Sequence, residues 1–239
     1  MVIVIKLKYK ASFYFSYLIM KEDLILFSNN YRVDNFIKEA LKASLIFSAY
    51  FITAYFGLKF GSIKSIATLF WPPAGISLAA LLIFGKRFWP VISIASFSVN
   101  VYTGTSVLIS SGICIGNTLE VLTGFYILTQ VGFDRSLERI RDVLFYIIQA
   151  AFIGSVISAT FGVISLYFGS EILLSDFIVT WFSWWLGNVM GFIIVGSFIL
   201  VWSKNIMISK INLLWSLEVF TLVFIACFGS FIVVSDFFR

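Results

Sequence analysis

GICIGNTLEVLTG, residues 112–124, places an amide, Asn117, and a carboxyl, Glu120, inside a stretch that is otherwise almost entirely apolar. Consecutive residues of an α-helix point roughly 100° apart. With that spacing, Gly112, Gly116 and Glu120 share one sector, and Asn117 lies at its border. Glycines four residues apart let a second backbone approach closely. This face is therefore predicted to pack against protein, with Gly112 and Gly116 as packing residues and Glu120 turned away from lipid.

The composition of the whole chain indicates that lipid is its main solvent. Of 239 residues, 60% are hydrophobic and only 12% are charged, whereas soluble domains carry about 25% charged residues. A soluble core could not hide so much apolar surface in a chain of this length. The sequence therefore predicts an all-α, polytopic membrane bundle whose first partner is the lipid bilayer.

Seven apolar segments are predicted to cross a hydrocarbon core of roughly 30 Å. They are residues 43–60, 64–85, 88–104, 106–129, 142–168, 176–203 and 212–237. Residues 43–239 would thus form one membrane-embedded domain. The preceding residues 1–42 are mixed and basic, and we expect a cytoplasmic or interfacial segment there that continues as a helix into the first span.

The Lys and Arg residues segregate strongly between the two sides of this arrangement. Seven spans place 14 of them on the side of the N-terminus and 3, namely Lys59, Lys64 and Arg239, on the other side. Loops rich in Lys and Arg stay in the cytoplasm. We therefore expect a multi-pass protein of the bacterial plasma (inner) membrane, with its N-terminus in the cytoplasm and Arg239 outside.

Residue types that carry catalysis or bind cofactors are scarce. The chain has no His, and its two Cys residues, Cys114 and Cys227, each fall within an apolar run. Histidine is the usual haem and catalytic zinc ligand. We therefore assign no catalytic, cofactor-binding or metal-binding residue and expect neither an enzyme nor a cofactor. The basic residues lie along membrane flanks instead of forming a patch, so no nucleic-acid partner is expected.

A carboxyl near the bilayer centre costs at least about 2.5–3.5 kcal/mol when charged, so Glu120 needs a proton or hydrogen-bond donors. No Lys or Arg lies at matching depth in any predicted span. Asn188, flanked by the packing glycines Gly187 and Gly191, is one candidate donor. The candidate sensing core consists of Asn100, Asn117, Glu120 and Asn188. These groups either hold the helices together or form a ligand or proton site, and both interpretations stay open.

FWPPAG, residues 70–75, interrupts the second span. Pro72 and Pro73 cannot donate to the carbonyls four residues earlier. A helix from Pro72 to Phe84 has 13 residues and is about 20 Å long, too short to cross. The span is therefore kinked, or it is a half-helix entered through unwound backbone. The motif is either a helix start with an interfacial Trp71 or an extracytoplasmic pocket. The candidate outer-pocket residues are Trp71, Pro72, Pro73 and Gly75.

Several motifs together resemble a known family. They are LFWPPAGISLAALLIFGKRFWP (69–90), Asn100, GNTLEVLTGFYIL (116–128), GFDRSLERIRDV (132–143) and WFSWWLGNVMG (181–191). In this order they resemble the first class of bacterial membrane-associated sensor (MASE) domains. The resemblance implies a polytopic helical sensor N-terminal to an output, typically a histidine kinase or an enzyme of cyclic-di-GMP metabolism. It also implies that a membrane partner protein is a candidate source of the signal.

Two departures from the family qualify what it implies. The family usually carries Asp where this chain has Asn188. The chain also ends at Arg239 before the last family span or spans and without an output signature. We therefore expect a truncated or split sensor, or a stand-alone membrane module, with a kinase or cyclic-di-GMP output domain that is fused or separate.

Two functions from different classes follow. The first is the sensory input module of a bacterial signal-transduction system, such as a two-component system, in which a signal shifts the packing of the bundle. The alternative is a small transporter or proton-coupled carrier that uses Glu120, because intramembrane carboxyls and broken helices are common parts of such proteins. The loop 132–143 is either a solvated connector or a contact surface for a cytoplasmic module.

Overall fold

The structure, a computed structural model, describes residues 33–59, 62–63 and 67–208. Regular structure in these ranges is helical apart from one minimal hairpin. Four of the described helices are long and apolar enough to cross a membrane: Val33–Lys59, Val107–Gln130, Ile140–Phe168 and Leu174–Ser203. The expected all-α membrane fold is confirmed to this extent. The count of seven spans stays a prediction, and the span 212–237 lies outside the described residues.

The chain divides into two compact units, Met1–Ser44 and Leu45–Arg239. The helix Val33–Lys59 passes through this boundary without a break. In the second unit, this helix buries a stripe of residues four apart, Ile46, Tyr50 and Ala54. Residues at that spacing lie on one face of a helix. The sites described below all belong to the second unit.

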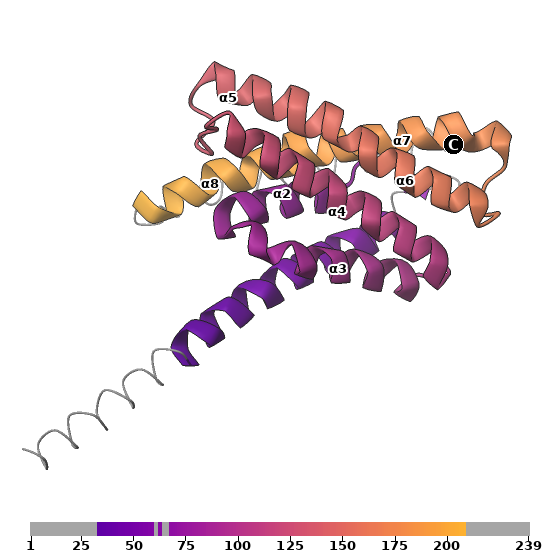
Figure 1. Ribbon diagram of the computed structural model, residues 1–239, viewed down its shortest axis with the longest axis horizontal. Helices are drawn as coiled ribbons and strands as arrows, with labels where there is room; N and C mark the ends of the chain where they lie inside the picture. The colour runs from indigo at the N-terminus through magenta and orange to yellow at the C-terminus, as the bar shows by residue number, and fades with distance from the viewer. Residues whose placement is uncertain (1–32, 60–61, 64–66, 209–239) are drawn as a thin grey trace, which may run out of the picture. The chain divides into compact units, whose positions relative to one another are not determined.

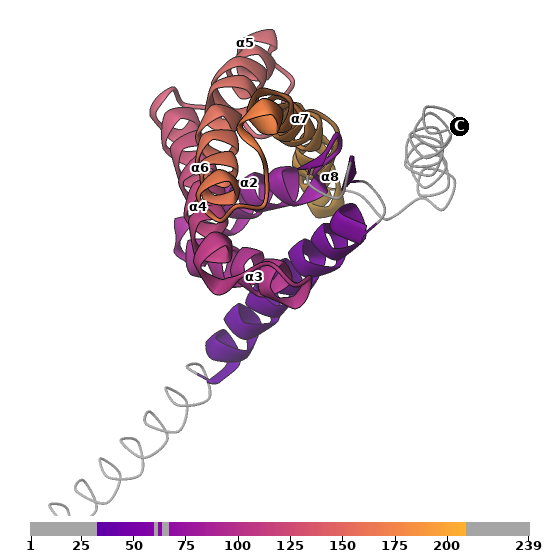
Figure 2. The same cartoon turned by 90° about the vertical axis from the view of Figure 1, so that its right-hand side faces the viewer.

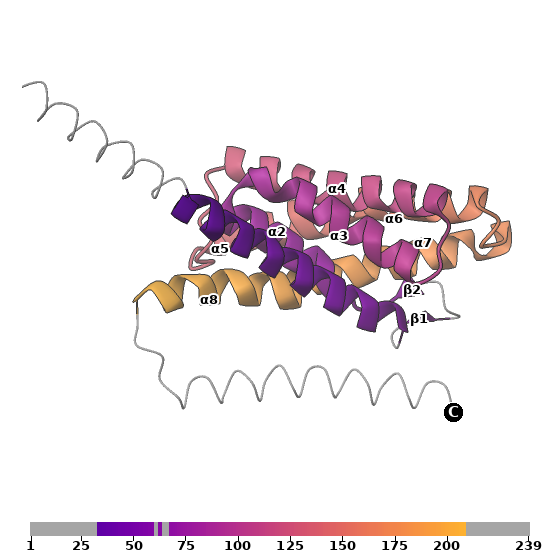
Figure 3. The ribbon, with the colours of Figure 1, turned by 90° about the horizontal axis from the view of Figure 1, so that it is seen from below.

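The segment predicted as the second span is two pieces of structure. Strand β1, Ser62–Ile63, pairs antiparallel with β2, Ala67–Thr68, and the hairpin lies against the end of α7 (Figure 3). Helix α2, Pro72–Phe84, then begins at a proline, where the missing N–H costs no helical hydrogen bond. It ends at Gly85, whose φ is +99°. The half-helix interpretation is confirmed, and the alternative of one kinked helix over 64–85 is wrong.

A helix as short as α2 is tolerated in a membrane bundle because protein surrounds it. Eight of its 13 residues are buried, and a helix that is apolar all round belongs inside a bundle. Figure 2 shows α2 among α4, Val107–Gln130, α7, Phe177–Met190, and α8, Ser197–Ile208. A length of about 20 Å suffices there, since Thr68 and Trp71, which precede the helix, are also buried in protein.

The remaining helices follow their local signals. Helix α3 is Trp89–Tyr102, and a helix containing α5, Ile140–Phe145, and α6, Gly154–Phe168, follows α4. A short turn of 3₁₀ helix, Lys86–Phe88, precedes α3, and another, Leu174–Asp176, precedes α7. Gly104, with φ +99°, ends the turn after α3, and the side chain of Ser106 caps α4 by accepting from the amide of Ile109.

Helices α4 and α6 run side by side (Figure 1). The predicted packing glycines lie in this interface: a Cβ on Gly112 would collide with Ser165, and one on Gly116 with Phe161. Each glycine therefore sets the distance between the two helices, as the sequence indicated.

Two π-helical segments interrupt the long helices, η2 at Tyr146–Ile153 and η4 at Gly191–Gly196. In an α-helix, residues five apart point roughly 140° apart. The wider π turn brings Gly196 close to the face of Gly191, so that Gly191 contacts the carbonyl of Trp71 and Gly196 contacts Gly75. Tyr146 Oη donates to the carbonyl of Phe192 at 3.0 Å and thereby joins the two segments.

Candidate functional site

Glu120 of α4 and Asn188 of α7 form a buried pair in the interior of the bundle. Each is 1% exposed. The Nδ2 atom of Asn188 donates to both carboxyl oxygens of Glu120, at 2.9 Å to Oε1 and 3.0 Å to Oε2. This orientation agrees with the sector predicted for Glu120, and it supplies the donor that the sequence required.

A second polar network surrounds Asn117. Its Nδ2 donates to Ser96 Oγ at 2.9 Å and to Tyr50 Oη at 3.3 Å. Ser158 Oγ donates to Asn117 Oδ1 at 2.6 Å and accepts from Trp184 Nε1 at 3.1 Å. Five helices contribute one residue each, and both ends of the Asn117 amide are satisfied. Asn117 therefore acts as interhelical glue, because a buried amide with partners on every side leaves no atom for a ligand.

The Asn188 amide differs from the Asn117 amide because its oxygen has no hydrogen-bond partner in the described part of the chain. Within the described residues, Asn188 Oδ1 is buried and has no hydrogen-bond partner. Buried polar atoms nearly always have one, so this acceptor calls for an explanation.

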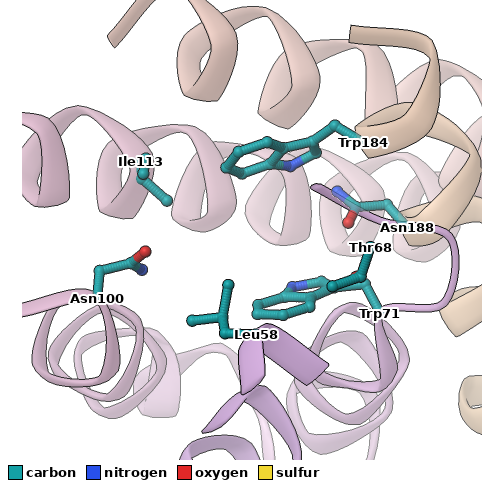
Figure 4. A pocket seen from close by; sticks show the side chains of 7 residues that line it. All are labelled: Leu58, Thr68, Trp71, Asn100, Ile113, Trp184 and Asn188. Atoms are coloured by element: carbon teal, nitrogen blue, oxygen red, sulfur yellow. The ribbon is translucent and has the colours of Figure 1, made fainter. Parts of the chain in front are cut away.

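Asn188 lies at one end of a cavity that we name the inner chamber. Its volume is about 30 Å³, room for roughly two water molecules. Figure 4 shows the indoles of Trp71 and Trp184 on opposite sides, with Asn188 at one end and Asn100 at the other. The chamber is lined by Leu58, Thr68, Trp71, Asn100, Ile113, Trp184 and Asn188.

A wider cavity, the outer chamber, adjoins the first and shares four of its lining residues. Its volume is about 350 Å³. Its lining residues are Leu58, Asn100, Thr103, Gly104, Thr105, Ile113, Leu166, Glu171 and Trp184. The outer chamber therefore lies at the end of the bundle formed by the turn after α3 and the turn after α6. Together the two chambers lead from polar turns down to the Asn188 amide.

Backbone contacts hold Trp71 in place beside this cavity. The amide of Trp71 donates to the carbonyl of Gly187 at 2.9 Å. Gly187 contacts the carbonyl of Thr68, and Gly191 contacts the carbonyl of Trp71. A Cβ at either glycine would collide with that backbone. The predicted pair Gly187 and Gly191 therefore packs the non-helical entrance of α2 directly against α7.

The structure separates the residues predicted for the outer pocket. Trp71 lines the inner chamber and is 8% exposed, and its depth in the membrane stays a prediction. Pro72, Pro73 and Gly75 are not among the described lining residues of either chamber, and their assignment to an outer pocket stays a prediction. The two prolines start α2, and Gly75 instead packs against the backbone of η4.

The predicted sensing core is also divided. Asn100 and Asn188 line the inner chamber, and Glu120 lies behind Asn188, to which it is bonded. Asn100 donates through Nδ2 to the carbonyl of Ser96 at 2.8 Å, which leaves its oxygen for the cavity. Asn117 belongs to the neighbouring satisfied network.

Several residues that contribute to the chambers and the polar networks were not identified from the sequence. Tyr50 could have been noticed, because it stands at the middle of its span instead of at an interfacial position. Ser96 and Leu58 carry no distinguishing signal. Glu171 belongs to a turn that the hydropathy pattern marks only as a connection. Tyr146 is significant only because of the π segments, which no local pattern announces.

Comparison with known proteins gives one match. No curated protein and no solved structure matches the chain. The sequence profile of the MASE1 family matches residues 42–235, which is most of the chain and includes both chambers and the polar networks. The chain therefore belongs to the MASE1 family of membrane-associated sensor domains.

Proposed function

We propose that this chain is the sensory input module of a bacterial signal-transduction system, and that the Asn188 amide is where the signal is received. The output is a kinase or cyclic-di-GMP domain, fused to the module or separate from it. The observation that carries the proposal is the unpartnered oxygen of Asn188, a buried residue that lines a cavity within an apolar bundle. A site built only for stability has no reason to leave a buried acceptor empty.

Access to the site follows from the distribution of charge. The outer chamber lies at the end of the bundle that holds the turns after α3 and α6. The segregation of Lys and Arg assigns this end to the outside and the N-terminus to the cytoplasm. A solute outside the plasma membrane would then reach Asn188 without crossing the bilayer.

Transmission starts from α7, which carries both Trp184 and Asn188. The same helix continues through η4 into α8, and η4 packs on α2 through Gly191 and Gly196. Occupancy of the chamber changes the contacts of Asn188 and Trp184 and thereby biases the packing of η4 on α2. A ligand can shift the equilibrium between two packings of the bundle only if it makes different contacts with each of them.

The test is a domain exchange. Residues 42–235 replace the matching domain of a MASE1 protein that carries its own kinase or cyclase, and output per molecule is measured in membranes. Asn188→Leu is expected to alter output per molecule, after correction for any change in abundance. Thr129→Ala, on an exposed part of the same bundle, is the control and is expected to leave output unchanged. If Asn188→Leu changes output only in proportion to abundance, the proposal is refuted.

The carrier alternative has one observation in its favour. The carboxyl of Glu120 is hydrogen-bonded to Asn188, which lines the inner chamber. Uptake into proteoliposomes distinguishes it from the sensor. A carrier shows substrate or proton flux that is lost in Glu120→Gln. A sensor shows none in either form.

A further inference from the structure

The chemistry of the two chambers defines the class of ligand they accept. Asn188 lies at one end of the inner chamber (Figure 4) and is 1% exposed, and its Oδ1 has no hydrogen-bond partner among the described residues. Its Nδ2 is already engaged with Glu120. The free atom of this amide is therefore an acceptor, and what it lacks is a hydrogen-bond donor.

Two further polar side chains of the chambers, those of Asn100 and Glu171, have the same character. Asn100 uses its Nδ2 on the carbonyl of Ser96, and its amide points into the inner chamber in Figure 4. Glu171 lines the outer chamber, and the carboxyl of Glu120 lies directly behind Asn188. Neither chamber has a Lys or Arg among its described lining residues. Among their described lining residues, the chambers thus offer amide acceptors and one carboxyl, that of Glu171, and no Lys or Arg.

The walls of the inner chamber favour a cation. The indoles of Trp71 and Trp184 lie on opposite sides of it (Figure 4). The face of an indole attracts a cation more strongly than do the rings of Phe or Tyr. The chamber volume of about 30 Å³ admits a group the size of one or two water molecules. A primary ammonium fits this space, whereas a quaternary ammonium does not.

We propose that the chambers bind a small organic cation whose primary ammonium enters the inner chamber and donates to Asn188 Oδ1 between the indoles of Trp71 and Trp184. The rest of the ligand occupies the outer chamber, whose volume of about 350 Å³ is in the range of small-molecule sites. This inference names the ligand class of the sensor and so rests on the proposed function.

The test measures binding to the purified full chain in lipid nanodiscs by tryptophan fluorescence. The probes are n-propylammonium, n-propanol, propionate and tetramethylammonium, which separate charge, shape and head-group size. Saturable binding of n-propylammonium is expected, at least tenfold tighter than that of n-propanol, with no binding of propionate or tetramethylammonium. Equal binding of n-propylammonium and n-propanol overturns the inference. So does the absence of saturable n-propylammonium binding up to 100 mM, which is roughly the weakest affinity expected of so small a ligand.

Variants tie the binding to this cavity. Asn188→Leu is expected to abolish n-propylammonium binding. Trp71→Leu keeps an apolar side chain and is expected to weaken binding about 2- to 30-fold, the range of a single cation–π contact. Trp185→Leu is the control, because Trp185 bonds to the carbonyl of Phe152 and lines neither chamber. If Asn188→Leu fails to fold, unchanged affinity in folded Trp71→Leu still overturns the inference.

The ligand class and the sensor function can be refuted independently of each other. If n-propylammonium binds as expected but leaves the output of the exchanged protein unchanged, the sensor function is refuted and the ligand class stands. If Asn188→Leu alters output but no ammonium probe binds, the ligand class is refuted and the sensor function stands.

Discussion

The Glu120–Asn188 pair should contribute a measurable coupling energy to the folding of the bundle. The perturbation is a double-mutant cycle with Glu120→Leu, Asn188→Leu and the double variant. Each single variant leaves a buried partner without its hydrogen bonds, because Asn188 Nδ2 donates to both oxygens of Glu120 and those two residues are almost completely buried. The double variant replaces the whole pair by apolar side chains of similar size, which is often nearly neutral.

The magnitude follows from the two bonds. Side-chain hydrogen bonds between membrane helices contribute about 0.6 kcal/mol on average and about 1.7 kcal/mol at most. Two bonds from one amide to one carboxyl therefore give a coupling of about 1–2 kcal/mol. The double variant should be less destabilised than the sum of the single variants by this amount.

The assay is equilibrium unfolding of the purified chain in mixed micelles, followed by circular dichroism. Glu120→Gln is the conservative control. It keeps one carbonyl acceptor for Asn188 Nδ2 and nearly the same side-chain shape, so it should change stability by less than about 1 kcal/mol. A coupling below about 0.5 kcal/mol, within the error of additivity, would refute the reasoning that this pair stabilises the bundle.

Three further outcomes are expected. Gly191→Ala should destabilise the chain by about 1–3 kcal/mol, since the new methyl group collides with the backbone of Trp71; an unchanged unfolding midpoint would contradict the close packing of η4 on the start of α2. Tyr146→Phe should lower the free energy of unfolding by about 0.5–1.5 kcal/mol, because the hydrogen bond to the carbonyl of Phe192 is lost. Tyr167→Phe, at a partly exposed position, should lower it much less. Equal losses would show that the hydrogen bond between the π segments adds no stability. In a chain without native cysteines, an impermeant thiol reagent added outside intact cells should label Thr105→Cys at once and Arg135→Cys only after permeabilisation; the reverse order would overturn the assigned orientation.

Helix positions were predictable from the sequence because they depend on local properties. The predicted segments 88–104, 106–129 and 142–168 correspond to α3, α4 and the helix Ile140–Phe168. The length and start of α2 also followed from its prolines. Hydropathy, glycine and proline each act on their own few residues, so they can be interpreted without knowing what lies opposite.

The composition of the site was only partly predictable. The helical spacing of residues 112–124 put Glu120 on a protein-facing side, and depth in the span suggested Asn188 as its partner. Periodicity along one helix cannot identify Ser96 or Tyr50 as partners of Asn117, because those contacts join residues 21 and 67 positions apart. Gly75 was assigned to the pocket because it adjoins Trp71 in sequence, yet the turn of α2 directs it to η4.

By itself the sequence determined the solvent of this protein, the approximate positions of its described helices and the inward direction of Glu120. Those features follow from the composition and periodicity of short segments. Only the tertiary structure decided that Asn117 is fully satisfied while the oxygen of Asn188 is not. It also decided that Asn188 lies at one end of a cavity between Trp71 and Trp184. Whether a polar atom has a partner depends on how separate helices pack, and in a lipid-embedded bundle that packing rests on close backbone contacts at a few glycines.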